Sequence, residues 1–223
     1  MSLGTLALVG GAEWRDGCTF DRELLDLAGG GEVLVLPTAA AYEFPARSVA
    51  WAEEYFHGLG SKARGLDVLR RPDAEDDANA DAVRAARFIY LSGGSPLHLR
   101  SVLKDSRVWD ALVHAFDEGA VVAGSSAGAM VLCDPMVDPR GGAFTLGLGL
   151  VEQLAVIPHH NSWSNDREHR TLKLAPKGLR IAGIDEQTAL IRSGDGTWRA
   201  AGAGDVTVWV DGRPADIAAL ETI

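Results

Sequence analysis

The most informative short motif is Gly-Ser-Ser-Ala-Gly-Ala at positions 124–129, which fits the pattern Gly-x-Ser-x-Gly. It follows an apolar segment and opens a helical pattern, which is the context of a nucleophile elbow. A sharp turn there would expose the Oγ of Ser126, and the free N–H groups at the helix start would stabilise a developing oxyanion. Ser125 occupies the x position, so we expect its side chain to point elsewhere. We therefore predict that Ser126 is the nucleophile of an acyl-transfer reaction; the alternative is a tight turn of small residues without chemistry.

A serine nucleophile needs a base, and two of the six histidines are well placed for that role. His159 and His160 follow the apolar segment 154–157, so they are expected at the carboxyl end of a strand, on the same edge as Ser126. Adjacent side chains diverge, so only one of the two can face the serine. We predict that one of them is the general base; the alternative is that both are surface loop residues.

A carboxylate should orient the imidazole of the base. Asp185 and Glu186 follow the apolar segment 180–184, which places them on the expected catalytic edge. Asp134 and Asp138 lie on an irregular excursion after the elbow helix. The residues alone leave the choice among these acids open.

Paired glycines end another apolar segment, in the sequence Ser92-Gly93-Gly94. Because glycine lets backbone N–H groups approach a substrate closely, we expect Gly93 or Gly94 to supply one arm of an oxyanion hole. The N–H of Ala127 would supply the other arm. The alternative interpretation of the glycine pair is a plain turn.

Two arginines follow the histidine pair closely. Arg167 and Arg170 are three positions apart, so a helix would place them on one face. Two guanidinium groups beside a hydrolase site suit a substrate carboxylate, which arginine can bind in a bidentate manner. The alternative is surface pairing with Asp166 and Glu168.

These residues require a scaffold that brings strand ends together. Short apolar segments alternate with helical patterns along the chain, and we expect strands at 5–9, 32–36, 66–69, 87–91, 120–123, 154–157, 180–184 and 188–191. The segments 198–201 and 207–210 look like a closing antiparallel pair turned at Asp211-Gly212. The alternation predicts an α/β fold, one domain over residues 1–223 with a doubly wound, mostly parallel sheet and a small antiparallel C-terminal addition.

The composition of the chain excludes some classes of binding partner. The formal net charge of −10 argues against a nucleic-acid binder, and no apolar run reaches the length that spans a bilayer. The first ten residues lack a basic region and read as the start of a strand, not as a signal peptide. Two distant cysteines, Cys18 in a loop and Cys133 on a helix, do not make a disulfide framework. We expect a cytoplasmic protein without nucleic-acid or membrane partners.

In combination, several motifs resemble a known family, the serine peptidases that include aspartyl dipeptidase (peptidase E) and cyanophycinase. The elbow is similar to the family's Gly-x-Ser-Ala-Gly-Ala. The other matching segments are Gly10-Gly11-Ala12-Glu13, Ser92-Gly93-Gly94, Pro158-His159-His160, Arg167-Glu168-His169-Arg170 and Gly183-Ile184-Asp185-Glu186-Gln187-Thr188-Ala189.

The resemblance implies a flavodoxin-like sheet, similar to the class I glutamine amidotransferase domain, and peptide hydrolysis without metal or cofactor. It places the base on His159. The cyanophycinase-like segment points to Glu186 as the acid, with Asp138 or Asp134 as alternatives. It further implies that His160, Arg167 and Arg170 contact a small acidic peptide, in a monomer or homodimer.

The activity implied is hydrolysis after an amino-terminal aspartate, and the chain is shorter than typical cyanophycinases, which favours a small peptide over a polymer. The alternatives are an exopeptidase acting on β-aspartyl-arginine peptides and an esterase of related mechanism. An α/β-hydrolase esterase usually places its histidine far downstream, whereas only 33 positions separate Ser126 from His159. A non-enzymatic module that binds an acidic metabolite is a further alternative, and the Ser–His pairing argues against it.

Overall fold

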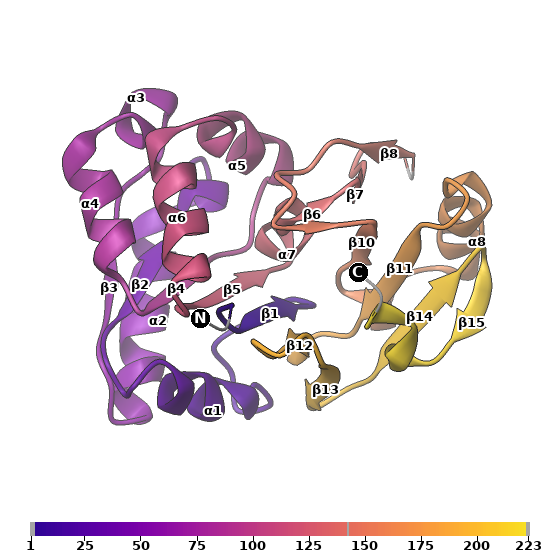
Figure 1. Cartoon of the computed structure of the whole chain (residues 1–223), viewed down its shortest axis with the longest axis horizontal. Coiled ribbons are helices and arrows are strands. Elements are labelled where there is room, and N and C mark those ends of the chain that lie inside the picture. The colour runs from indigo at the N-terminus through magenta and orange to yellow at the C-terminus, as the bar shows by residue number, and fades with distance from the viewer. Residues whose placement is uncertain (1–2, 142, 222–223) are drawn as a thin grey trace.

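The computed structural model describes residues 3–141 and 143–221, so Gly142, within the expected irregular excursion, lies outside the described residues. Its centre is a seven-stranded sheet in the order β13-β12-β1-β5-β4-β2-β3 (Figure 1). Five neighbouring strands are parallel: β1 (Leu6–Val9), β5 (Val121–Ser125), β4 (Phe88–Leu91), β2 (Val33–Leu36) and β3 (Ala63–Gly65). Two antiparallel strands, β12 (Thr188–Arg192) and β13 (Trp198–Gly202), extend the other edge. The expected α/β fold with a mostly parallel sheet is confirmed.

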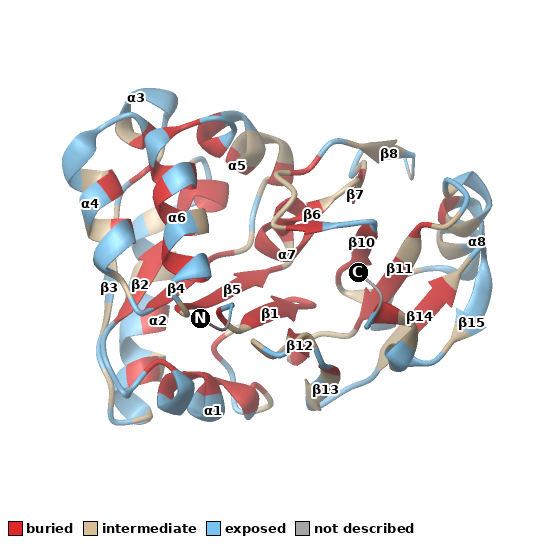
Figure 2. Ribbon diagram, in the orientation of Figure 1, coloured by how far each residue is buried: buried red, intermediate tan, exposed pale blue. Residues whose placement is uncertain are grey.

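Helices cover both faces of this sheet, which is why its central strands are apolar throughout. On one face α1 (Phe20–Leu27) and α2 (Pro45–Gly58) pack against alternate strand residues such as Val9 and Tyr90. The opposite face carries α4 (Asp77–Ala85), α5 (Pro96–Leu103), α6 (Arg107–Asp117) and α7 (Ala127–Leu132), with the short α3 (Arg71–Ala74) nearby. Figure 2 shows the buried strands between helices whose outer sides are exposed.

A second sheet lies beside the first, in the order β10-β11-β14-β15. It contains β10 (Leu154–Ile157), β11 (Arg180–Ile184), β14 (Val206–Val210) and β15 (Arg213–Ala215), and α8 (Asn165–Leu174) connects β10 to β11. Short pieces complete the described chain: η1 (Thr38–Ala40), β6 (Cys133–Asp134), β7 (Met136–Val137), β8 (Phe144–Thr145), β9 (Val151–Glu152), η2 (His160–Ser162) and η3 (Ile217–Leu220).

The predicted closing pair of strands, 198–201 with 207–210, is wrong. β13 pairs with β12 in the first sheet, whereas β14 pairs with β11 in the second. The chain between them changes sheets after Gly202. This position has a φ of +118°, and a Cβ there would lie 2.3 Å from the carbonyl oxygen of Gln187, so both its conformation and its surroundings favour glycine. The turn at Asp211-Gly212 does form, with positive φ at both residues, but it joins β14 to β15.

Two local predictions also differ from the structure. The third strand is Ala63–Gly65, not 66–69, although Val68 is fully buried. The apolar residues of segment 66–69 reflect burial in the core, whereas the residues that pair with β2 are 63–65, just before that segment. Cys133 begins β6 instead of ending the elbow helix. Within residues 3–141 and 143–221, no helix combines the length and apolarity needed to cross a membrane.

Candidate active site

Ser126 lies at the sharp turn between β5 and α7. Its backbone has φ 47° and ψ −101°, a conformation that costs a non-glycine residue about 1–3 kcal/mol. Its N–H donates to the carbonyl of Val9 at 2.9 Å. The flanking glycines are required sterically, because a Cβ on Gly124 would lie 2.6 Å from the carbonyl carbon of Gly128, and one on Gly128 would lie 2.6 Å from the oxygen of Leu91. The motif therefore forms the nucleophile elbow that its sequence predicts.

The structure brings Ser126, His159 and Glu186 into one line of hydrogen bonds. The Oγ of Ser126 is 2.9 Å from Nε2 of His159, and Nδ1 of the same ring is 2.8 Å from Oε1 of Glu186. The histidine and glutamate side chains are about one-third exposed, at 36% and 39%. This order of groups is that of a serine nucleophile, a base and an acid that orients the base.

The first loop, after β1, holds the catalytic histidine in place. The N–H of His159 donates to the carbonyl of Gly10 at 2.7 Å, and the N–H of Gln187 donates to the carbonyl of Gly11 at 2.8 Å. The imidazole packs directly on Gly11, because a Cβ there would be 2.2 Å from Cε1 of His159. The N–H of Glu186 donates to the side-chain oxygen of Asn161 at 3.2 Å. The loops after β1, β10 and β11 thus support one another.

The other acids considered from the sequence are engaged elsewhere. Asp134 accepts a hydrogen bond from the N–H of Gly147 at 2.7 Å. Asp138 pairs with Arg140, and the hydrogen bonds from that guanidinium and its backbone N–H lower the pKa of Asp138 to about 2. Asp185 accepts from the N–H of Asp205 at 3.1 Å. In the described chain Glu186 is the acid that contacts His159.

His160 points away from Ser126, toward α8 and the second sheet. Its Nε2 lies 2.7 Å from Glu168 and its Nδ1 lies 3.5 Å from Asp185. Its ring also meets the edge of Trp209, with 5.4 Å between centroids. As adjacent residues diverge, the turn that directs His159 to Ser126 directs His160 to α8 and the second sheet. His160 therefore anchors α8.

The two arginines of α8 are exposed. The guanidinium of Arg167 lies over the ring of Trp163, 4.1 Å from its centroid. No ion pair of Arg167 or Arg170 with a carboxylate occurs among the residues that the structure describes, so surface pairing with Asp166 or Glu168 does not occupy them.

One of the predicted oxyanion-hole donors is already occupied. The N–H of Gly93 donates to Oε1 of Glu13 at 2.9 Å, and the hydroxyl of Ser125 donates to the other carboxylate oxygen at 2.7 Å. The expectation that Gly93 is free to bind an oxyanion is therefore corrected. The N–H groups of Gly94 and Ala127 have no acceptor in the described part of the chain and remain the candidate donors.

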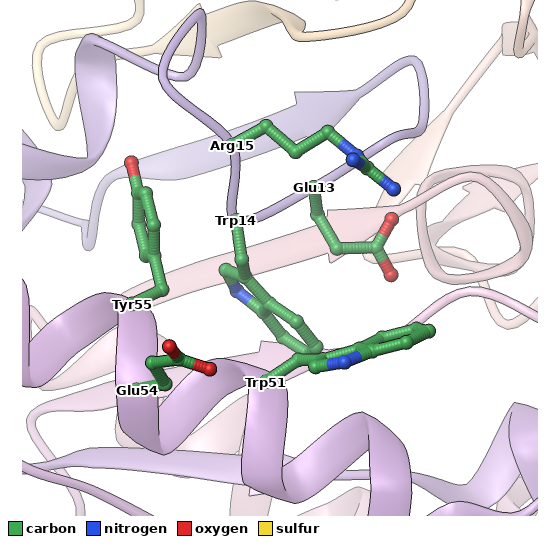
Figure 3. Close-up of a pocket in the computed structure, with 6 residues that line it drawn as sticks. All are labelled: Glu13, Trp14, Arg15, Trp51, Glu54 and Tyr55. Atoms are coloured by element: carbon green, nitrogen blue, oxygen red, sulfur yellow. The ribbon is translucent and has the colours of Figure 1, made fainter.

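Two adjoining hollows share Glu13, Trp14, Arg15 and Trp51 in their walls, and Figure 3 shows the residues that line the second of them. The first, of about 220 Å³, is bounded by the loop 12–15, by Glu43 and α2, and by the glycine pair 93–94. The second, of about 250 Å³, continues between Glu13, Trp14, Arg15, Trp51, Glu54 and Tyr55. We refer to both together as the first-loop pocket. The sequence analysis did not predict this pocket, although Glu13 and Arg15 lie shortly after Gly10-Gly11, in the loop that follows β1.

Comparisons with known proteins agree with this arrangement. The model of peptidase family S51 matches residues 6–199. Cyanophycinase from Synechococcus elongatus is 29% identical over 94% of this chain and 69% of its own length, and that from Geminocystis herdmanii is 28% identical over 94% and 81%. A peptidase structure from an acI-B1 actinobacterium is 29% identical, with a TM-score of 0.86 over 96% of this chain and 93% of its own. A candidate peptidase E from Listeria monocytogenes EGD-e shares the fold at 19% identity, with a TM-score of 0.71 over 91% and 100%.

Proposed function

This chain belongs to peptidase family S51 and is a serine-type peptidase, and we propose that it hydrolyses small peptides after an amino-terminal aspartate. The observation that carries the proposal is the continuous pairing of Ser126 with His159 and of His159 with Glu186, at 2.9 and 2.8 Å. That pairing supports an acyl-enzyme mechanism in which Ser126 is the nucleophile, His159 the general base and Glu186 the orienting acid.

In this mechanism His159 accepts the hydroxyl proton of Ser126 as the Oγ attacks the peptide carbonyl. The N–H groups of Ala127 and Gly94 stabilise the oxyanion, aided by the positive end of α7. The tetrahedral intermediate collapses, the carbon–nitrogen bond breaks, and the imidazolium gives its proton to the leaving amine. Water then loses a proton to His159 and attacks the acyl-enzyme. The bond from the acyl carbon to Oγ breaks, the imidazolium returns its proton to the Oγ of Ser126, and the acid product leaves.

We further propose that the α8 arginines bind the side-chain carboxylate of the aspartate. Two facts support this. Arg167 and Arg170 are exposed and unpaired with carboxylates among the described residues, and the protein's net charge of −10 means that an acidic substrate needs a local cationic group. A guanidinium also matches a carboxylate in shape.

A second candidate function is exopeptidase activity on β-aspartyl-arginine peptides. The specific observation in its favour is that the curated relatives, matched over 90–94% of this chain, are cyanophycinases. The two substrates differ in which carboxyl group of aspartate forms the scissile bond, so the same triad could serve either.

The test is metal-free hydrolysis of Asp-Leu, Asn-Leu, Glu-Leu, Ala-Leu and β-Asp-Arg by purified protein. We expect the highest kcat/KM for Asp-Leu, a decrease of about 10-fold or more on loss of the guanidinium in Arg170→Ala, and no turnover in folded Ser126→Ala. Lys177→Ala, a surface charge change elsewhere, is the control. Preference for β-Asp-Arg would select the second candidate, and rapid hydrolysis of neutral acyl esters only would show an esterase.

A further inference from the structure

The carboxylate of Glu13 lies beside the nucleophile. One of its oxygens accepts the N–H of Gly93 at 2.9 Å and the other accepts the hydroxyl of Ser125 at 2.7 Å. A Cβ placed on Gly93 would be 3.3 Å from Oε1 of Glu13 and 3.6 Å from the Cβ of Ser126. The two contacts hold the carboxylate between the glycine pair and the elbow, where the acyl group of a substrate must sit.

A negative charge at this place opposes acyl transfer unless something neutralises it, because the reaction itself creates an oxyanion nearby. Glu13 forms no ion pair within the described residues. Figure 3 shows Arg15 extending beside Glu13 from the same loop, but its side chain is exposed, and exposed ion pairs contribute little. Arg15 and Arg47 both line the first-loop pocket, but neither forms an ion pair with Glu13 among the described residues. A positive charge on the substrate can therefore neutralise this carboxylate.

The walls of the first-loop pocket suit a small cation. Trp14 and Tyr55 line it together with Trp51, which is 53% exposed, and Glu54 stands at its far side. Aromatic faces attract cations, and the guanidinium of Arg47 already lies 5.1 Å from the ring centroid of Trp51. An ammonium entering from the pocket could therefore reach Glu13 while remaining next to Ser126.

We propose that Glu13 binds the α-ammonium group of the residue whose carbonyl Ser126 attacks, so that the first-loop pocket selects substrates with a free amino terminus. This inference rests on the proposed function and adds a specificity residue to it. In the proposed arrangement the ammonium lies toward Glu13 and the side chain extends toward α8. The bound ammonium cancels the charge of Glu13, so cleavage of an amino-terminal residue is favoured over internal cleavage.

The experiment compares p-nitroanilides of aspartate and alanine with their N-acetyl derivatives in wild type and Glu13→Gln. Glutamine keeps an oxygen for the N–H of Gly93, so the turn is preserved. We expect wild type to favour the free amine by about 10- to 100-fold in kcat/KM, the range of a charged hydrogen bond, and the variant to lose most of that ratio. Glu54→Gln, the same charge change in the same pocket without the Gly93 contact, should keep the wild-type ratio.

A merely structural role of Glu13 would lower turnover of free and acetylated substrates by the same factor, and an unchanged ratio in Glu13→Gln overturns the proposal. So does a wild-type enzyme that cleaves acetylated substrates equally well. The alanine pair separates this inference from the aspartate proposal. If alanine and aspartate substrates are cleaved alike but both depend on Glu13 for amine preference, the ammonium site stands and the aspartate assignment fails.

Discussion

The contact between Gly11 and His159 allows a prediction that tests the active-site geometry through a residue without side-chain chemistry. In Gly11→Ala the new Cβ would lie 2.2 Å from Cε1, 2.6 Å from Nε2 and 2.7 Å from Nδ1 of His159. Ordinary contact between such atoms is about 3.5 Å or more, so the ring must move by about 1 Å. The substitution also places alanine at φ +122°, a region that disfavours side chains.

A displacement of this size breaks the alignment of the serine, imidazole and carboxylate. The hydrogen bonds of His159 to Ser126 and Glu186 are 2.9 and 2.8 Å long, and neither tolerates an additional ångström. Misplacement by about 1 Å costs on the order of 100-fold in rate. We therefore expect kcat to fall by about 100-fold or more, and the free energy of unfolding to decrease by about 1–3 kcal/mol from the backbone strain.

The assay is steady-state hydrolysis of the best peptide found for wild type, with the rate of fluorophosphonate labelling of Ser126 as a second measure of nucleophile activation. Thermal unfolding verifies that the variant is folded at the assay temperature. Gly178→Ala is the matched control, since Gly178 also has a positive φ, +82°, but a Cβ there meets nothing within 4 Å. A folded Gly11→Ala protein with wild-type kcat and labelling rate would refute the proposed position and role of His159.

Three further predictions concern single groups. Glu186→Gln should lower kcat by about 100- to 10,000-fold in the peptidase assay, because the amide stabilises imidazolium poorly, whereas Asp138→Asn should leave kcat unchanged. Burial, with the charge of Glu13 as a smaller cause, raises the pKa of Asp21 well above its usual value. The unfolded chain therefore releases this proton more readily than the folded protein, and the free energy of unfolding decreases as pH rises above about 4. Asp21→Asn should therefore gain stability relative to wild type between pH 4.5 and 7.5 in urea titrations, by up to about 1.4 kcal/mol per pH unit, and a pH-independent difference would contradict this. Cys18 and Cys133 are buried free thiols, and burial raises the pKa of Cys18 to about 11, so neither should react with Ellman's reagent at pH 8 until the protein unfolds.

Local pattern was sufficient for much of the scaffold. The strands 154–157 and 180–184 have the predicted bounds, because each is an apolar segment closed by proline or a polar turn. The pairing of strands was less accessible. Strands β13 and β14 are consecutive and both half-buried, so their pattern does not reveal that they belong to different sheets. Pairing depends on partners far along the chain.

The active-site residues also differ in whether local sequence or long-range contacts determine their positions. Steric demands at Gly124, Ser126 and Gly128 are local, so the elbow could be read directly from its motif. His159 and Glu186 were favoured by family resemblance, while residue chemistry alone left several acids open. Glu13 meets Gly93 and Ser125 across 80 and 112 positions, and no spacing rule relates them. That contact occupies an expected oxyanion donor, and Glu13 also lines the first-loop pocket.

The sequence by itself determined that a strand, a strained serine turn and a helix occur in succession, and that several polar residues follow strand ends, because these features depend on neighbouring residues. Only the tertiary structure decided which of those strand ends face one another. Hydrogen bonds act over about 3 Å, and such distances are set by the packing of loops that follow five separate strands: β1, β4, β5, β10 and β11. The meeting of Ser126 with His159 and Glu186, the turning of His160 toward Glu168, and the capture of Gly93 by Glu13 all follow from that packing.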